Sequence, residues 1–311
     1  MIKPYKDNQK NVKRDKMKHI PLLILTLCIA PFSAHAQESD VKIIQIKNNI
    51  HVLISPKGGN VIASTGEDGT FIIDDQLAGR SALIKAAAKS INDQDIKFVL
   101  NTHYHFDHTG GNEFFGEENA IIVAHDNVRE RLSTKQFITY FSKEMTPLSK
   151  AGLPVVTFSK DMTFHHNGDD IKIIHVPHAH TDGDAAAYFV NENVLVTGDT
   201  VFNSMYPFID IEHGGSISGL LAAHDTLLAL ANDDTVIVPG HGAPMSKAGL
   251  LAYQKTLKTI VARVETAIKD GKTLEQTIAA KPTQEFDEKM SKGIVGPDAF
   301  TTILYNHLSN K

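Results

Sequence analysis

The stretch Asn101-Thr-His-Tyr-His-Phe-Asp-His-Thr-Gly-Gly-Asn112 places three histidines and one aspartate within six positions. It follows Ile96-Lys-Phe-Val-Leu100, an apolar, partly β-branched run that predicts a buried strand. Two glycines then interrupt the chain, so we expect the histidines to lie in a loop at the C-terminal end of that strand. Imidazole and carboxylate groups are the usual ligands of Zn²⁺ and related ions, and the stretch therefore predicts a metal site.

The spacing within this loop suits two neighbouring metal ions. A loop can turn alternate side chains toward two adjacent points, so that His103 and His105 share one ion while Asp107 and His108 reach a second. The alternative is a run of surface histidines, but such a dense cluster is an unusual composition for an ordinary loop. We therefore predict a dinuclear site.

Three segments of the second half carry further ligand types at the ends of apolar runs. His180 follows one run in His175-Val-Pro-His-Ala-His180-Thr, Asp199 follows another in Val196-Thr-Gly-Asp199, and His241 follows a third in Val236-Ile-Val-Pro-Gly-His241. Each stands where a predicted strand ends in a turn marked by Gly or Pro. Catalytic groups are commonly assembled from strand ends in this way.

Hydrophobic periodicity predicts two halves, each with strands, a helix and a further strand. Predicted strands cover residues 41–46, 50–54, 60–64, 70–73, 96–100, 120–123, 162–165, 171–176, 185–190, 194–197 and 235–238, and predicted helices cover 78–92, 126–132 and 218–231. Ser246 caps a long helix that ends at Gly271, and the last forty residues look helical. In residues 133–154 we expect helical pieces that cover the site. Two such halves would pack as two sheets with helices outside.

The first 36 residues predict a secretory signal peptide rather than a part of the fold. A short basic region begins at Met17, an apolar core covers residues 22–29, and Ala34-His-Ala36 has the small residues of a cleavage site. The apolar core is too short for a transmembrane helix. Translation can start at Met1 or at Met17, and the sequence leaves both open. We expect a mature chain that begins at Gln37 and is periplasmic or secreted.

Composition narrows the partners of the mature chain. Cys28, the single cysteine, lies in the removed segment, which suits export without disulfides. Residues 1–36 hold seven Lys and Arg against two Asp, so their removal changes the formal net charge from −5 to −10. An acidic chain without a basic run argues against nucleic acid or an anionic membrane as partner. We expect a small-molecule substrate and no stable membrane association, and the oligomeric state stays open.

Taken together, these motifs resemble the metallo-beta-lactamase-fold hydrolase superfamily over about residues 41–270. The resemblance implies an α+β fold, a four-layer αβ/βα sandwich, with two Zn²⁺ or other divalent transition metals at one edge. We accordingly expect the hydrolase domain at residues 37–271 and a C-terminal helical extension at 272–311. The implied ligands, a set shared with glyoxalase II, are His103, His105 and His180 for the first ion, Asp107, His108 and His241 for the second, and Asp199 as the bridge.

Several nearby residues need a choice between roles. We choose His180 over its neighbours because the family ligand directly precedes a threonine. His175 is expected to pack or to be hydrogen-bonded, and His178 to be a turn residue. Asp74 matches the family's opening strands and would orient a ligand imidazole, although a turn-flanking aspartate is the alternative. We expect the neighbouring pair His165 and His166 to be exposed.

The resemblance implies hydrolysis by a hydroxide that bridges the two ions and attacks a small ester, lactone, lactam or phosphodiester. Asp107 would orient the hydroxide and is the predicted catalytic residue. Three residues in the loop after Asp199 are predicted to face the substrate, namely Asn203, Tyr206 and His213.

Two classes of alternative stay open. A class B-like metallo-beta-lactamase suits export, but those enzymes have Cys or Ser at the position of Asp199, and no Lys or Arg occurs from Asp199 to Gly215 to anchor a drug's carboxylate. Glyoxalase II has an Arg-bearing loop that this chain lacks, and acyl-homoserine lactonases have a tyrosine at the position of Asn203. The other class is an iron-dependent oxidoreductase or a non-catalytic metal-binding protein on the same fold.

The cleavage site makes a direct prediction. Because the apolar core is followed by Ala34-His-Ala36, mass spectrometry of the periplasmic protein should find Gln37 as the N-terminal residue. A cytoplasmic chain with an intact Met1 would contradict it.

Overall fold

Two mixed β-sheets, one from each half of the chain, form the centre of the fold. The computed structural model describes Met1 and residues 41–310; apart from Met1, the predicted signal peptide lies outside these residues, as does its cleavage site. The first sheet has the order β1-β2-β3-β4-β5-β6-β9, with antiparallel pairing up to β4 and parallel pairing beyond it. Its strands are β1 (Lys42–Lys47), β2 (Ile50–Ile54), β3 (Val61–Ser64), β4 (Thr70–Ile73), β5 (Ile96–Leu100), β6 (Ile121–His125) and β9 (Val156–Phe158).

The second sheet has the order β10-β11-β12-β13-β14, and all its pairs are antiparallel except β13 with β14. Its strands are β10 (Asp161–His166), β11 (Asp169–His175), β12 (Ala185–Phe189), β13 (Val194–Val196) and β14 (Val236–Val238). Side chains alternate between its faces, as the pleat of a strand requires. Val194 and Val196 pack toward the first sheet, whereas Leu195 packs toward the helices.

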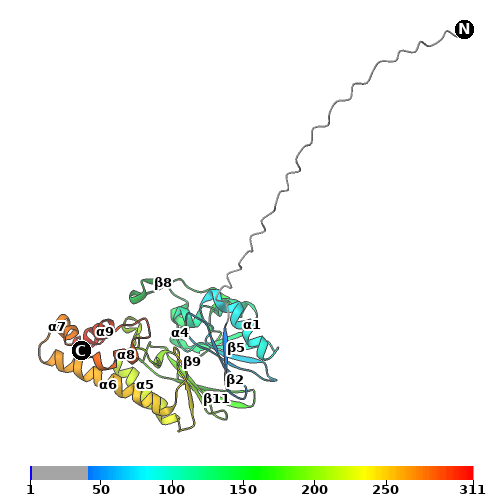
Figure 1. Ribbon diagram of the computed structural model, residues 1–311. Coiled ribbons are helices and arrows are strands. Elements are labelled where there is room, and N and C mark those ends of the chain that lie inside the picture. The colour runs from blue at the N-terminus through cyan, green and yellow to red at the C-terminus, as the bar shows by residue number, and fades with distance from the viewer. Residues whose placement is uncertain (2–40, 311) are drawn as a thin grey trace, which may run out of the picture. The chain divides into compact units, whose positions relative to one another are not determined.

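Helices cover the outer face of each sheet (Figure 1). On the first sheet, α1 (Ser81–Ile91) and α3 (Asn112–Glu117) bury Ile84 and Phe115 against β3 to β6. On the second sheet, α5 (Ile217–Leu230) and α6 (Lys247–Lys269) close a separate core. A third core lies between the sheets. The fold is thus the α+β four-layer αβ/βα sandwich that the sequence predicts.

The long helix α6 forms as its sequence predicts. The Ser246 side chain accepts a hydrogen bond from the backbone N–H of Gly249, and Gly271 follows the helix with a φ of 72°. A stripe that includes Leu250 and Leu257 is buried. The C-terminal helices α7 (Leu274–Ala279), α8 (Asp287–Met290) and α9 (Pro297–Ser309) follow, and α7 and α9 pack on α6. Within residues 41–310, no helix is both long and apolar enough to cross a membrane.

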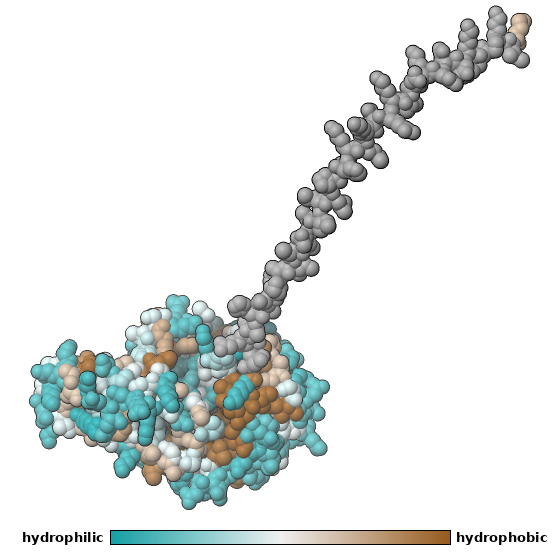
Figure 2. Space-filling view, viewed as in Figure 1, coloured by the Kyte–Doolittle hydropathy of each residue, from teal (hydrophilic) through white to brown (hydrophobic). Residues whose placement is uncertain are grey.

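The edge of the first sheet is formed by β1, in which Ile43 is an exposed apolar residue. Figure 2 shows that hydrophilic residues cover much of the visible surface, and that hydrophobic residues gather in a patch over the first strands. Lysines stand at both ends of β1, and its pairing with β2 is irregular between Gln45 and Lys47. Charges and bulges on an edge strand disfavour pairing with another chain.

Residues 133–154 depart from expectation, because their main element is a β-hairpin and their helical pieces are only two one-turn 3₁₀ helices, of which the second is η3 (Lys150–Gly152). The segment forms a hairpin of β7 (Gln136–Ile138) and β8 (Lys143–Met145), joined by the 3₁₀ turn η2 (Thr139–Phe141). Ser142 closes the turn in the left-handed region, with a φ of 47°, and Ile138 is the residue that the hairpin buries in the core. Three-residue strands carry too little periodicity to be recognised from sequence.

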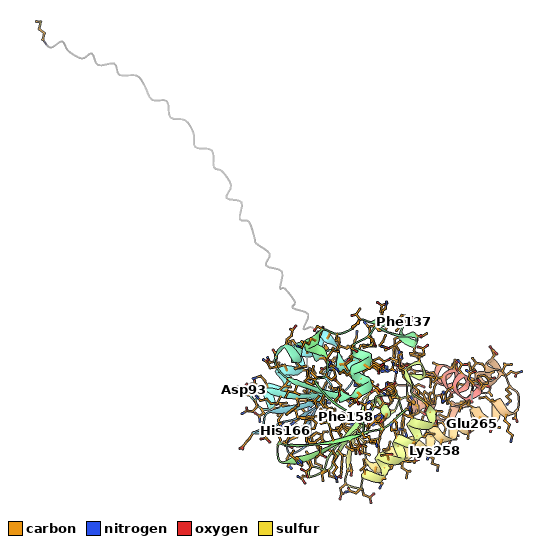
Figure 3. All side chains as sticks on the ribbon, turned by 180° about the vertical axis from the view of Figure 1, so that it is seen from behind. Asp93, Phe137, Phe158, His166, Lys258 and Glu265 are labelled. Atoms are coloured by element: carbon orange, nitrogen blue, oxygen red, sulfur yellow. The ribbon has the colours of Figure 1, made fainter. Side chains whose placement is uncertain are left out.

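The two neighbouring histidines of β10 have different surroundings. His165 is exposed, as predicted, and pairs with Asp170. His166 (Figure 3) is buried beside the rings of Phe71 and Phe98, so its predicted exposure is wrong. The two side chains point to opposite faces of the strand because successive residues alternate, and the face of His166 meets the inter-sheet core.

The core of α6 makes a stability prediction. Leu257 is fully buried, so Leu257→Ala should lower the free energy of unfolding by about 2–5 kcal/mol through lost burial and a residual cavity. Leu251 of the same helix is 55% exposed, so Leu251→Ala should change the free energy of unfolding by less than about 0.5 kcal/mol. Urea denaturation of both variants measures the difference. Equal losses in the two variants would contradict this placement of the helix.

Candidate metal centre

The ends of five strands bring the site together at one edge of the sandwich. Asp74 directly follows β4, the histidine loop follows β5, and α2 (Phe106–Thr109) lies within that loop. In the second sheet, His180 follows β11, Asp199 follows β13 in the 3₁₀ turn η4 (Gly198–Thr200), and His241 follows β14. Because both sheets present these ends to the same edge, residues far apart in the chain converge.

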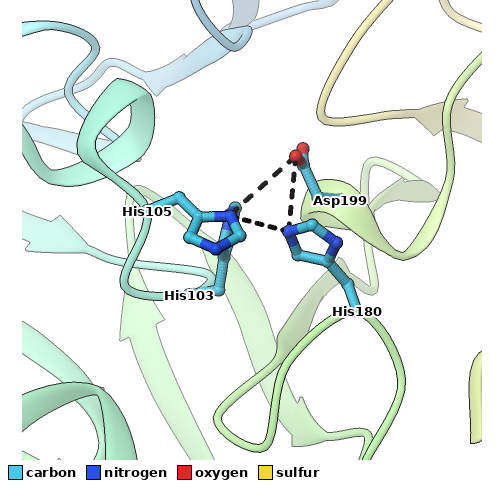
Figure 4. Close-up of side chains that lie close together, drawn as sticks. All are labelled: His103, His105, His180 and Asp199. Carbon is cyan, nitrogen blue, oxygen red and sulfur yellow. Dashed lines mark hydrogen bonds and ion pairs between the residues drawn. The ribbon is translucent and has the colours of Figure 1, made fainter. Parts of the chain in front are cut away.

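The seven predicted ligands form two groups of side chains. Within each group the candidate ligand atoms all lie within 4.8 Å of one another. The first group, drawn in Figure 4, is His103, His105, His180 and Asp199; the second group is Asp107, His108 and His241. Asp199 faces both groups, because its Oδ1 lies 3.2 Å from His108 Nε2 and its Oδ2 lies 3.7 Å from His180 Nε2.

Three of the imidazoles are oriented by a hydrogen bond at the ring nitrogen that faces away from the group. His180 Nδ1 donates to the Phe208 carbonyl over 2.8 Å. His105 Nε2 donates to Asp210 Oδ2 over 2.8 Å, and His108 Nδ1 donates to Asp74 Oδ2 over 2.7 Å. These partners assign the tautomer, so the other nitrogen of each ring directs a lone pair into its group. Asp74 thus makes the predicted hydrogen bond to one of these imidazoles.

The fourth imidazole is held through a relay. The Thr102 hydroxyl donates to Asp74 Oδ2 over 2.8 Å and lies 3.0 Å from His103 Nδ1, from which it accepts. His103 Nε2 is buried and has no hydrogen-bond partner among the described residues. In addition, His105 Nδ1 and His180 Nε2 lie 2.8 Å apart, although both carry lone pairs in these tautomers. Buried lone pairs that converge without donors fit a bound cation.

Burial keeps two histidines of the first group, His103 and His180, neutral. It lowers the pKa of His103 well below its usual value and lowers the pKa of His180 to about 4, with a further contribution from neighbouring histidines. Neutral imidazole is the form that binds a metal ion. The neutral state of His103 and His180 is therefore the one in which their inward nitrogens can bind a metal ion.

The second group has the opposite balance. Burial disfavours charge on His108 and His241, but the carboxylates of Asp199 and Asp107 outweigh it. The pKa of His108 is raised well above its usual value and that of His241 is raised to about 9. At Asp199 the balance is the reverse. Burial would raise the pKa of its carboxyl, but the neighbouring imidazoles of His108 and His241 outweigh burial and hold that pKa well below its usual value. The carboxylates thus create a strongly negative environment that attracts cations.

Two glycines allow the backbone to approach the ligands. A Cβ atom at Gly59 would overlap the His108 ring, and one at Gly240 would overlap Asp199 Oδ1. The adjoining backbone is also strained, since Asp74 and Gln76 have φ angles of 59° and 72°. Strain of this kind persists where the surroundings enforce it, and it clusters at functional sites.

Asp184 holds the loop that carries His180. Its carboxylate accepts hydrogen bonds from the backbone N–H groups of His180 and Thr181, over 2.6 and 2.7 Å, and from the Thr181 hydroxyl. Burial nevertheless raises the pKa of Asp184 to about 8. The loop is therefore positioned by its own carboxylate rather than by regular secondary structure.

A sequence model of the metallo-beta-lactamase superfamily matches residues 52–241, more than half of the chain and all seven predicted ligands. The chain belongs to the metallo-beta-lactamase superfamily. This superfamily consists of metal-dependent hydrolases, in agreement with the predicted resemblance.

Two relatives illustrate the similarity within the metallo-beta-lactamase superfamily. A hydroxyacylglutathione hydrolase of Pelagibacter ubique is 27% identical over 168 residues, which are 53% of this chain and 56% of that protein. A probable metallo-hydrolase of Methanocaldococcus jannaschii is 27% identical over 201 residues, which are 63% of this chain and 87% of that protein. The similarity therefore spans little more than half the length of the first relative.

A solved metallo-beta-lactamase from Pontibacter korlensis has a similar fold, with a TM-score of 0.58. The alignment covers 70% of this chain and 99% of that chain, with 18% sequence identity. At this identity the likeness concerns the fold alone.

The three predicted substrate contacts lie at different places. Asn203 is next to the second group, where its backbone N–H donates to the His241 carbonyl over 3.0 Å. Tyr206 is buried; its ring stacks on Phe300, and its hydroxyl donates to Asp287 over 2.7 Å. Tyr206 thus points toward the C-terminal helices rather than into the metal groups.

His213 is buried, and its Nδ1 lies 2.7 Å from Asp210 Oδ1. Asp210 also binds His105, so His213 contacts the carboxylate that orients a histidine of the first group. His175 and His178 have the predicted hydrogen bonds, to the carbonyls of Asp184 and Gly214 respectively. His175 also stacks on His125.

Asp210 is the residue that sequence reasoning missed. Its Oδ2 accepts from Tyr104 over 2.6 Å as well as from His105, and its Oδ1 binds His213. Burial would raise its pKa, but these hydrogen bonds keep the pKa below its usual value, so the carboxylate stays charged. It lies 105 positions from His105, and no local spacing connects the two.

With Zn²⁺ as the probe ion, Asp210→Asn should weaken metal binding at the first group by about 10-fold or more, because the neutral amide makes His105 a poorer ligand. Competition with a chromogenic chelator measures the affinity. Asp225→Asn is the control, since Asp225 is an exposed aspartate that pairs with Lys258. Wild-type zinc affinity in both variants would contradict a role for Asp210.

Proposed function

We propose that the mature chain is an exported dinuclear zinc hydrolase that acts on a small ester, lactone, lactam or phosphodiester. The observation that carries the proposal is the position of Asp199. Its Oδ1 lies 3.2 Å from His108 Nε2, and its Oδ2 lies 3.4 Å from His241 Nε2 and 3.7 Å from His180 Nε2. A single buried anion therefore contacts both groups of ligand atoms and can serve both metal ions. Export rests on the predicted signal peptide, and the choice of zinc rests on the imidazole-rich ligands.

Two bound zinc ions would polarise the substrate and lower the pKa of a bound water toward neutrality. The open edge of the site is formed by Asp107 and His241, whose side chains are 19% and 22% exposed, whereas the other predicted ligands are buried. Burial opposes charge on Asp107, but His108 and His241 keep its pKa below the usual value. Asp107 is therefore a partly exposed, charged carboxylate that can orient a water molecule and accept its proton.

The relatives bear on the substrate. One relative is a hydroxyacylglutathione hydrolase, which adds a thioester to the substrates to be tested. A β-lactam is the second candidate, because the chain shares the fold of a metallo-beta-lactamase. Asp199 and the absence of Lys and Arg from residues 199–215 argue for other substrates, since a β-lactam drug carries a carboxylate to be anchored.

Metal content and a substrate panel test the proposal. Mature protein purified from zinc-supplemented cells should hold about two zinc ions per chain and should hydrolyse at least one of a p-nitrophenyl ester, a lactone, a thioester, a phosphodiester, a cephalosporin and a carbapenem. Asp199→Asn should lose affinity chiefly at one group and lower kcat/KM by at least ~10²-fold, because it removes a central charge. His103→Ala combined with His105→Ala should empty the first group and abolish turnover.

Each alternative has its own outcome. Full activity with one metal ion per chain would reject the dizinc hypothesis. Iron as the only bound metal would also reject it and would favour an iron-dependent oxidoreductase. A β-lactam with the highest kcat/KM would establish the lactamase alternative. Two bound zinc ions without turnover of any compound would indicate a metal-binding protein without catalysis.

A further inference from the structure

Four aromatic side chains from three distant segments lie together beside the first metal group. They come from the histidine loop, from the hairpin of β7 and β8, and from the loop after Asp199. We call them the aromatic wall, which consists of Phe106, Tyr140, Phe141 and Phe208. The metal-centre roles described above do not use their side chains, so another reason is needed for their gathering.

Phe208 connects the aromatic wall to the metal ligands. Its ring centroid lies 5.8 Å from those of His105 and of His180. Its carbonyl accepts the Nδ1–H of His180, so the same residue orients a ligand and presents a ring beside it. The wall therefore starts in direct contact with the site.

The hairpin extends this apolar surface outward. The rings of Tyr140 and Phe141 lie 5.1 and 5.0 Å from that of Phe208, and Phe141 also lies 6.0 Å from Phe106. Phe208 is only 7% exposed, but Tyr140 is 39% exposed. An apolar surface left accessible beside a polar centre is typical of a ligand site, in which aromatic side chains bind the apolar part of the ligand.

The hairpin is held in place by contacts on both sides. Ile138 is fully buried in the core, and the Tyr140 hydroxyl donates to the Ile294 carbonyl over 3.1 Å. The backbone N–H of Thr139 donates to Glu212 over 3.4 Å. A surface that is already ordered loses little conformational freedom when a ligand binds.

Two cations must be considered, one beside Tyr104, which is outside the wall, and one beside Phe106 of the wall. Arg131 forms an ion pair with Asp182 and lies over Tyr104. Lys143 of the hairpin lies 5.4 Å from the ring centroid of Phe106. Lys143 is an exposed lysine, and an ammonium group that water can reach is strongly hydrated, so it is a weaker anchor for a ligand than the rings beside the metal group.

We propose that the aromatic wall binds the apolar group of the substrate, and that the substrates are therefore uncharged esters or lactones with a bulky alkyl or aromatic acyl group. This inference rests on the proposed hydrolase function and narrows its substrate class. It makes Tyr140, Phe141 and Phe208 the residues that determine specificity.

Chain-length dependence tests the inference in zinc-loaded mature protein. From p-nitrophenyl acetate to octanoate, kcat/KM should rise by about 10-fold or more, since each buried methylene adds to binding. Tyr140→Ala and Phe141→Ala should each remove most of this rise while the zinc content stays unchanged. Phe137→Ala is the matched control. Phe137 (Figure 3) belongs to the same hairpin, is 51% exposed and should leave the ratio as in the wild type.

Equilibrium binding supplies a readout that is independent of turnover. By calorimetry, zinc-loaded protein should bind octanoate at least about 10-fold more tightly than acetate, and both hairpin variants should lose that difference. Lys143→Met should preserve the preference for octanoate esters. If a charged thioester is the best substrate and Lys143→Met selectively impairs it, the inference is overturned.

The two levels of the proposal fail in different ways. Equal kcat/KM for acetate and octanoate esters, unaffected by Tyr140→Ala and Phe141→Ala, would reject the role of the aromatic wall and leave the hydrolase function intact. Absence of hydrolysis of every ester, lactone, thioester, lactam and phosphodiester in the panel would reject the function itself. The octanoate and acetate affinities would then still decide whether the wall binds apolar groups.

Discussion

The carboxylate of Asp199 is the group on which the arrangement of the site depends. A buried anion is costly unless cations or hydrogen-bond donors surround it. Here Oδ1 faces His108 and Oδ2 faces His103, His180 and His241, so the anion brings both groups of ligands to one point. Position 240 requires glycine, because a Cβ atom there would overlap Asp199 Oδ1.

This central contact also requires the two halves of the chain to dock accurately. Asp74 from the first sheet orients His108 of the same half, but Asp210 from the second half orients His105 of the first. The Asn60 side chain adds hydrogen bonds to the Pro239 and Gly242 carbonyls across the same edge. Imidazole orientation and sheet packing are therefore coupled, and a shift of one sheet would disturb both metal groups.

Rigid and irregular parts of the fold supply different functions. The ligands follow strands, whose hydrogen-bonded pairing fixes the positions of their ends. The apolar surface beside them comes from a short hairpin and a loop, which can vary in sequence without altering the sheets. This division explains how a fold shared with relatives named for different hydrolase activities can carry its own substrate preference.

Local spacing in the sequence was sufficient to predict two sheets with helices outside, most of the strands and helices, and the histidine loop. The four-layer sandwich and the complete set of ligands followed from the resemblance to the metallo-beta-lactamase superfamily. Hydrophobic periodicity marks each strand, and His103 to His108 stand together in one loop. Only the tertiary structure revealed that Asp210 orients His105, that Tyr206 points to the C-terminal helices and that residues 133–154 form a hairpin. Those features depend on contacts between distant residues, and such contacts exist only once the two sheets have packed.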